Sequence, residues 1–162
     1  MGAGSPDFIV RPEAKWDPEA WSRFGGATVG LGALSPTASE YAVFAAVAGA
    51  GPIMIRDVLF STDTAITVYV KSKNSNPGLP AQNITSLTSA AYSNPGWTIQ
   101  AGLSSSAVGF YDLTRAFLPA GWFGSLFGAL RLFLDANTSL MVLTSAVAAN
   151  VSCSFHVYST GV

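Results

Sequence analysis

The sequence predicts an all-β protein, an antiparallel β-sandwich of the jelly-roll type with an extended N-terminal arm. Three observations predict it. Apolar and polar residues alternate in several short segments, turn residues recur about every 8–12 residues, and no segment resembles the crossover helices that a parallel sheet needs. The 162 residues fit one domain. We therefore expect an arm over residues 1–24 and a sandwich domain over residues 25–162.

The arm differs in composition from the rest of the chain. It holds seven of the seventeen charged residues, and prolines stand at positions 6, 12 and 18. Proline fixes φ and biases the preceding residue toward extended conformations, so most of the arm should be extended. Asp17-Pro18-Glu19 is typical of a helix start and Gly25 of a helix end, which leaves room for a short helix between them.

The two clearest strands have apolar residues at every second position. Ile66, Val68 and Val70 alternate with polar or half-polar neighbours, and so do the apolar residues of 151–157. Weaker patterns indicate further strands over 27–34, 40–48, 53–61, 97–103 and 107–112. Residues 72–82, rich in Asn, Ser, Pro and Gly, form the longest expected loop.

The last third of the chain is expected to be a meander of three strands. Leu130, Leu132 and Leu134 alternate with other residues, the turn residues 135–138 follow, and a second strand should then pair with the first as a hairpin before 151–157. The apolar residues of 121–134 also fit a helical spacing. Two glycines inside that helix would cost about 1 kcal/mol each, so we favour strands there.

Composition indicates that another molecule covers part of the surface. Charged residues make up 10% of the chain and hydrophobic residues 49%, against a usual ~25% charged. We therefore expect an obligate assembly, a homo-oligomer for which we favour a trimer. The net charge of −1 with scattered cations excludes a strongly basic nucleic-acid binder. No apolar run is long enough to predict a membrane span.

Side chains that could carry catalysis are few, and we expect no enzyme, no metal and no cofactor. Cys153 and His156 are each the single residue of their type. The strand period places Cys153 inward and His156 outward, so they cannot form a dyad. Asp57 and Asp63 flank one strand, and we interpret them as an edge charge and a turn-forming side chain.

Aromatic residues divide into two groups with different expected roles. Those of 117–133 should be core residues. The aromatic residues of the arm should instead anchor a partner, because each can bury about 150–250 Å² and an ordinary terminal tail is poor in aromatics. These expected partner-binding residues are Phe8, Trp16, Trp21 and Phe24.

The segments Ile55–Val70 and Ala149–Tyr158 carry a resemblance to known proteins. Both alternate short hydroxyl residues with branched apolar ones. In this alternating pattern the chain resembles the small jelly-roll structural proteins of tailed bacteriophages, namely capsid decoration or cement proteins and related tail and spike modules. The resemblance implies a trimer of sandwiches seated on a shell, and it transfers no functional residue by position.

Two functions follow as expectations. The first is a non-enzymatic virion protein on the capsid surface, a decoration or cement protein that binds the major capsid protein or other virion subunits and stabilises the head shell. The alternative is a tail, spike or lectin-like module that binds host-surface polysaccharide. Its stacking platforms would be Tyr69, Tyr92, Trp97 or Tyr111.

Overall fold

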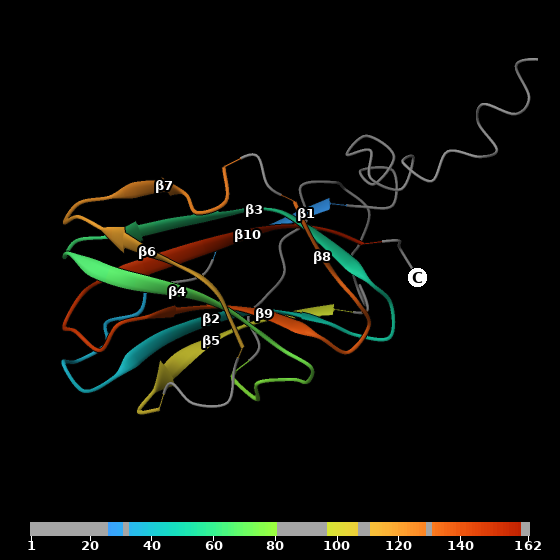
Figure 1. Cartoon of the computed structure of the whole chain (residues 1–162), viewed down its shortest axis with the longest axis horizontal. Coiled ribbons are helices and arrows are strands. Elements are labelled where there is room, and N and C mark those ends of the chain that lie inside the picture. The colour runs from blue at the N-terminus through green and yellow to red at the C-terminus, as the bar shows by residue number, and fades with distance from the viewer. Residues whose placement is uncertain (1–25, 31–32, 81–96, 107–110, 129–130, 160–162) are drawn as a thin grey trace, which may run out of the picture.

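A computed structural model of the chain describes residues 26–30, 33–80, 97–106, 111–128 and 131–159 (Figure 1). These residues form ten β-strands and no helix. The strands are β1 (Gly26–Gly30), β2 (Tyr41–Ala48), β3 (Ile53–Thr62), β4 (Ile66–Lys73), β5 (Trp97–Ser104), β6 (Tyr111–Leu118), β7 (Phe123–Ser125), β8 (Leu132–Leu134), β9 (Ser139–Thr144) and β10 (Val151–Ser159).

The strands form two antiparallel sheets that pack as a β-sandwich, which confirms the predicted class. Sheet 1 has the order β1-β10-β3-β7, and β8 pairs with the other end of β3. Sheet 2 has the order β5-β2-β9-β4-β6. Figure 1 shows the two layers, with β3 and β10 in one and β2, β4 and β9 in the other. Among the described residues no helix is long and apolar enough to cross a membrane.

The main core lies between the sheets and uses one face of each strand. Phe44 of β2 and Phe60 of β3 meet edge to face, with ring centroids 6.1 Å apart. Val68 and Val70 of β4 and Cys153 and Phe155 of β10 lie in the same core. The alternation predicted for 66–70 and 151–157 is therefore confirmed, because each strand buries every second residue between the sheets.

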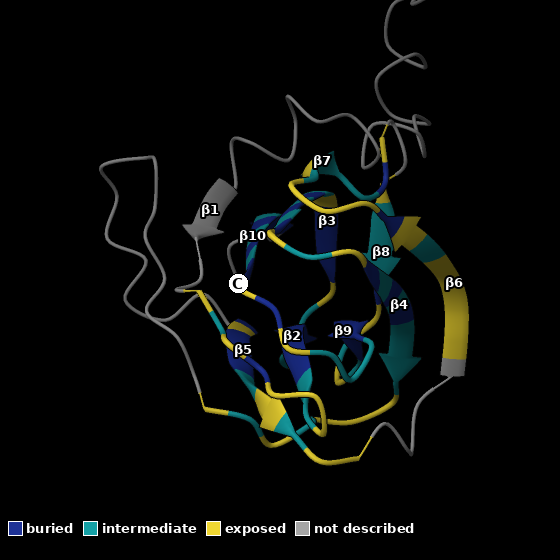
Figure 2. Ribbon diagram, turned by 90° about the vertical axis from the view of Figure 1, so that its left-hand side faces the viewer, coloured by how far each residue is buried: buried dark blue, intermediate teal, exposed yellow. Residues whose placement is uncertain are grey.

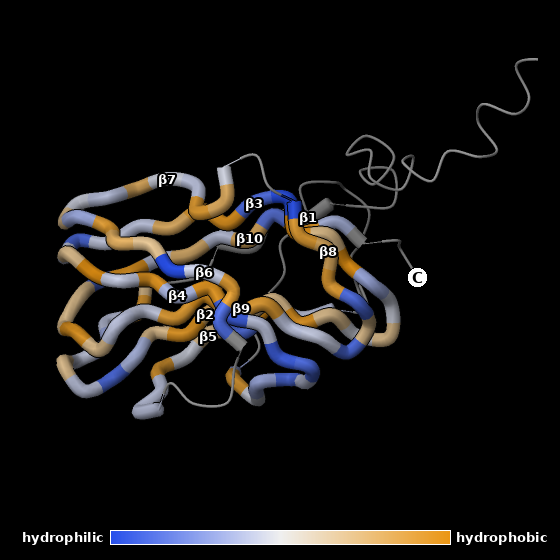
Figure 3. Tube along the Cα trace, viewed as in Figure 1, coloured by the Kyte–Doolittle hydropathy of each residue, from blue (hydrophilic) through white to orange (hydrophobic). Residues whose placement is uncertain are grey.

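The outer face of sheet 2 carries a second apolar cluster. Its buried members are Val43, Ala45, Val47, Met141 and Leu143. β2 and β9 are consequently buried on both faces, as Figure 2 shows, and they are nearly continuous apolar runs (Figure 3).

The loop after β4 packs along this outer face. Leu79 contacts the cluster. The Oε1 atom of Gln100, a residue only 4% exposed, accepts a 3.0 Å hydrogen bond from the Leu79 amide. The Ala101 amide donates a 3.1 Å bond to the Pro80 carbonyl. A Cβ at Gly102 would lie 3.3 Å from Pro80, so glycine permits this close approach.

The predicted meander in the last third is wrong. The turn itself is present, since the Thr138 amide donates a 3.2 Å bond to the Asp135 carbonyl and Asn137 has a φ of 61°. However, β8 pairs with β3 in sheet 1, whereas β9 lies between β2 and β4 in sheet 2. The turn carries the chain across the sandwich, because turn residues determine where a chain reverses and not which strand it then meets.

The structure also corrects the expected bounds of one strand and decides between strand and helix for another segment. The strand expected over 107–112 is observed as β6, Tyr111–Leu118. The span 121–134 contains the short strands β7 and β8 and no described helix. The arm and its short helix lie outside the described residues.

Candidate functional site

The connection between β6 and β7 forms an apolar corner, which we define as residues 117–123. The Trp122 amide donates a 3.3 Å bond to the Pro119 carbonyl, and Gly121 has a φ of +75°. A glycine with positive φ at this position is typical of a type II turn. The Trp122 carbonyl accepts a 3.0 Å bond from the Thr62 amide. The corner is therefore fixed to the end of β3.

Two phenylalanines of this corner are exposed. Phe117 is 77% exposed and Phe123 is 72% exposed. Phe117 borders a shallow hollow of about 330 Å³ that Ala65 and Val147 also line. No charged residue stands between Arg115 and Arg131 in the sequence. The expectation that aromatics of this stretch are core residues is wrong for these two.

The loops around the apolar corner carry little charge. The described loops 33–40, 63–65, 119–122 and 145–150 contain Glu40 and Asp63 and no cation. The Asn150 amide and side chain donate hydrogen bonds of 2.8 and 2.6 Å to Asp63, and the Thr64 hydroxyl donates one of 2.8 Å. These donors lower the pKa of Asp63. The corner thus lies in an apolar, weakly anionic end of the molecule.

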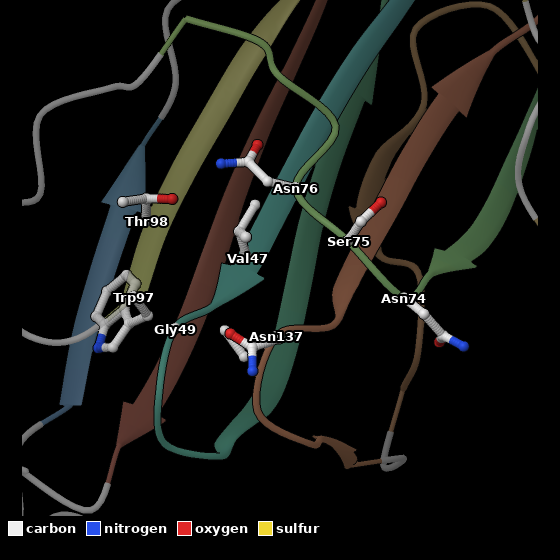
Figure 4. A pocket seen from close by; sticks show the side chains of 9 residues that line it. Val47, Gly49, Asn74, Ser75, Asn76, Trp97, Thr98 and Asn137 are labelled. Carbon is white, nitrogen blue, oxygen red and sulfur yellow. The ribbon is translucent and has the colours of Figure 1, made fainter.

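A pocket of about 450 Å³ lies at the opposite end of sheet 2. β4 runs from Ile66, which pairs with Leu118 beside the corner, to Lys73, which precedes the pocket residue Asn74. Eight strand residues span roughly 23 Å, so the two sites are well separated. We call this site the amide pocket. Its described lining residues are Val47, Ala48, Gly49, Asn74, Ser75, Asn76, Trp97, Thr98 and Asn137 (Figure 4).

Hydrogen bonds hold two asparagines of the amide pocket in place. The Oδ1 atom of Asn76 accepts bonds from the Gly78 amide at 2.7 Å and from Nε2 of Gln100 at 2.9 Å. The amide nitrogen of Asn76 then points toward the Thr98 side of the pocket (Figure 4). The Asn137 backbone amide donates a 2.9 Å bond to the Gly49 carbonyl.

Trp97 stands at the wall of this pocket. It belongs to the main core and is 3% exposed. Its indole N–H is buried without a hydrogen-bond partner, the single side-chain atom of this kind in the described part of the chain. Buried polar atoms are nearly always paired in native proteins, so this donor needs an explanation.

Cys153 and His156 lie on opposite faces of β10, as the strand period predicts. Cys153 is in the core, and burial raises the pKa of its thiol. His156 is half-buried on the other face, and its ring lies 5.4 Å from that of Tyr158. Burial and the nearby Arg56 guanidinium lower the pKa of His156. Within the described ranges no three His, Cys, Asp or Glu side chains gather as a metal site would require.

Asp57 lies within β3 and not at its end, so the expectation that it flanks a strand is wrong, whereas Asp63 follows the strand directly. Both carboxylates accept hydrogen bonds from the backbone and from nearby side chains. Asp57 accepts hydrogen bonds from the Ser125 hydroxyl and, at 2.8 Å, from the Val58 amide. Asp63 has the turn-forming role that the sequence predicts. Nothing in their contacts pairs them with each other.

The structure leaves the expected partner-binding residues untested and separates the expected platforms. Phe8, Trp16, Trp21, Phe24 and Tyr92 lie outside the described residues, as does the side chain of Tyr111. Tyr69 packs on the outer cluster of sheet 2 beneath the Lys71 ammonium, which lies 5.5 Å from the ring centroid. Trp97 faces the main core. Tyr69 and Trp97 therefore form no common surface.

Sequence reasoning named Trp97 of the amide pocket as a candidate ligand-binding residue, but it missed the exposed phenylalanines of the corner and the asparagines of the pocket. Phe117 lies between Ala116 and Leu118, which pack toward the core, and that alternation is a signal that it faces outward. The asparagines of the amide pocket stood out only as loop and turn residues. Their proximity depends on sheet order, which a sequence pattern does not specify.

Comparisons with known proteins give no relative. No protein-family model, no curated protein and no solved structure matches this chain.

Proposed function

We propose that this protein is a non-enzymatic structural protein of a virus particle, a capsid decoration or cement protein that binds and stabilises the head shell of a tailed bacteriophage. The apolar corner is the observation that carries the proposal. Phe117 and Phe123 are exposed at the two strand ends that flank a turn, and that turn is hydrogen-bonded to β3. Exposed, rigid aromatic side chains of this kind suit apolar depressions on another protein, where such residues act as anchors.

The strand order supports a jelly-roll topology, the fold of many capsid proteins. In an eight-stranded jelly roll the first, last, third and sixth strands form one sheet, and the second, seventh, fourth and fifth form the other. We count β7 and β8 as two pieces of one strand and β5 as an insertion. The observed orders then match this scheme. The fold supports the function only by analogy.

We further propose that the assembled form is a homo-oligomer, which the low charge of the chain supports, and we favour a trimer because the resemblance to phage structural proteins implies one. Charged residues make up 10% of it, and monomeric soluble proteins seldom expose large apolar patches. On the particle the partners would be the major capsid protein or other virion subunits. Native mass spectrometry of the full chain measures the number of copies, and a monomer at micromolar concentration would contradict this part of the proposal.

Sedimentation with purified capsids tests the attachment. The full chain should pellet with capsids of the phage that encodes it, in a saturable manner. A double variant, Phe117→Ser with Phe123→Ser, should lose most of this binding while its melting temperature stays close to that of the parent, because both side chains are exposed in the free chain. Loss of two anchors is expected to weaken binding by on the order of 2–4 kcal/mol.

A matched control comes from the opposite edge of sheet 2. Leu103 of β5 is also an exposed apolar residue, and β5 and β6 are the two edge strands of that sheet. Leu103→Ser should leave capsid binding unchanged. Equal binding by the double variant and the parent would exclude the corner as the attachment surface.

The alternative function, polysaccharide binding through aromatic platforms, has less support in this form. Tyr69 packs beside Lys71 on an apolar cluster and Trp97 is buried in the core. We therefore place the assembly role first.

A further inference from the structure

The amide pocket has the size and composition of a small-molecule site. Its volume of about 450 Å³ falls within the range of roughly 300–1,000 Å³ usual for such sites. We propose that it binds a neutral sugar unit of a glycan. The proposal is independent of the apolar corner, which lies at the other end of the molecule.

The absence of charge among the described lining residues selects the ligand class. All nine are uncharged, and three of them are asparagines. A phosphate or carboxylate would lose its hydration without a cation to replace it. A sugar hydroxyl can both donate and accept a hydrogen bond. It therefore matches the side-chain amide of asparagine, which has an NH₂ group that donates and a carbonyl oxygen that accepts.

Polar groups of the pocket remain available for such a ligand. Both bonds to Asn76 engage its Oδ1 atom, so the two protons on its Nδ2 are directed at the pocket without a described protein acceptor. The side chains of Thr98 and Asn137 have no hydrogen-bond partner among the described residues, and Thr98 is exposed. Together these groups offer donors and acceptors on two sides of the pocket (Figure 4).

Trp97 closes one wall of the pocket from the core side. The buried indole N–H has no acceptor within the described part of the protein. Because this N–H is buried, it serves as a probe of the neighbouring pocket and is not counted among the groups that contact the ligand.

The pocket is formed before any ligand arrives. The Ala48 amide donates a 2.9 Å bond to the Thr138 carbonyl, and the Asn137 amide donates one of 2.9 Å to Gly49. These bonds fix the turn that carries Asn137 to the end of β2. A preformed site loses less conformational entropy on binding.

Asn137→Gly is the most informative variant. The φ of 61° at Asn137 is one that glycine adopts without strain, so this change removes the side-chain amide and keeps the turn. Asn74→Ala is the matched control, because Asn74 also borders the pocket but points away from it (Figure 4). Asn76 is left unchanged because its bonds to Gly78 and Gln100 also hold the loop.

The test uses the full chain on an array of neutral and acidic bacterial polysaccharides, followed by calorimetry with an oligosaccharide of the strongest neutral glycan. We expect saturable binding to a neutral glycan and a loss of affinity of about tenfold in Asn137→Gly. Asn74→Ala should bind like the parent, and both variants should keep its melting temperature.

A second readout locates the ligand. The indole N–H signal of Trp97 in a ¹H–¹⁵N spectrum, assigned with Trp97→Phe, should shift on titration. The proposal is overturned if the array shows no neutral glycan, if acidic glycans bind more tightly, or if binding persists in Asn137→Gly without a shift at Trp97. None of these results bears on capsid sedimentation.

Discussion

Asp63 shows how one side chain can hold three segments of this sandwich together. It follows β3, and it accepts hydrogen bonds from Asn150, which precedes β10, and from Thr64, which precedes β4. The Asp63 amide also donates a 3.1 Å bond to the Asn150 carbonyl. A short acidic side chain at a turn can satisfy backbone donors in this way because it accepts on both oxygens.

The lowered pKa of Asp63 predicts a dependence of stability on pH. Its ordinary value is 3.8, and folding lowers it. The unfolded chain then binds the proton more readily, so the stabilisation is present above that value and is lost as the pH falls through the lower folded pKa. The melting temperature should fall between about pH 5 and pH 2, and Asp63→Asn should remove part of this fall. An identical pH profile in the variant would show that other groups cause it.

Gln100 marks the limit of sequence reasoning at this scale. A glutamine in a strand is ordinarily a solvent-facing residue. Here the outer face of β5 is covered, and Gln100 bonds to both Leu79 and Asn76. Its partners lie in the loop after β4, so they depend on where this loop passes over β5. The local sequence pattern does not predict the path of that loop.

At the scale of elements, the turn of the apolar corner depends on Gly121. An L-residue at a φ of +75° is strained, even though a Cβ at this position would meet no other atom within 4 Å. Gly121→Ala should therefore lower the free energy of unfolding by about 1 kcal/mol, measured by urea denaturation.

The neighbouring position provides the control for this prediction. Ala120 is exposed in the same turn and has no positive φ. Ala120→Ser should change the free energy of unfolding by less than about 0.5 kcal/mol. Equal stability of Gly121→Ala and the parent would mean that the turn adopts another conformation in solution.

Strands with one covered face were predictable, whereas strand order was not. β4 and β10 alternate because each has one face in the main core. β2 and β9 do not alternate, since the outer cluster buries their second face as well. The hairpin expected between 130–134 and 140–142 is not formed, for a different reason. Its turn is correct, but β8 gains a partner in β3, a strand distant in sequence.

The whole molecule has two unlike ends. The apolar corner lies where β3 leads into β4, and the amide pocket lies where β2 leads toward β3. If the corner is seated on a shell, the far end of the sandwich is turned away from that shell. The two proposals are thus compatible in one molecule, one for attachment and one for contact with a glycan outside the particle.

Removal of the arm tests the proposed division of the chain. β1 begins at Gly26 and pairs with β10 from Gly26 opposite Tyr158 to Gly30 opposite Ser154. The alternating pattern that predicts the sandwich also begins after Gly25. Deletion of residues 1–24 should therefore change the free energy of unfolding by less than about 1 kcal/mol. The melting temperature should then stay within a few degrees of that of the parent.

The same deletion should weaken attachment to capsids, because the arm carries the expected anchors Phe8, Trp16, Trp21 and Phe24. Trp16→Ala combined with Trp21→Ala should reproduce much of the loss, on the order of 2–4 kcal/mol for two well-buried anchors. Thermal melting reports on the fold, and capsid sedimentation reports on attachment. A truncated chain that melts far below the parent yet binds capsids at full strength would assign the arm to the core of its own sandwich, and the apolar corner would then be the sole attachment surface proposed.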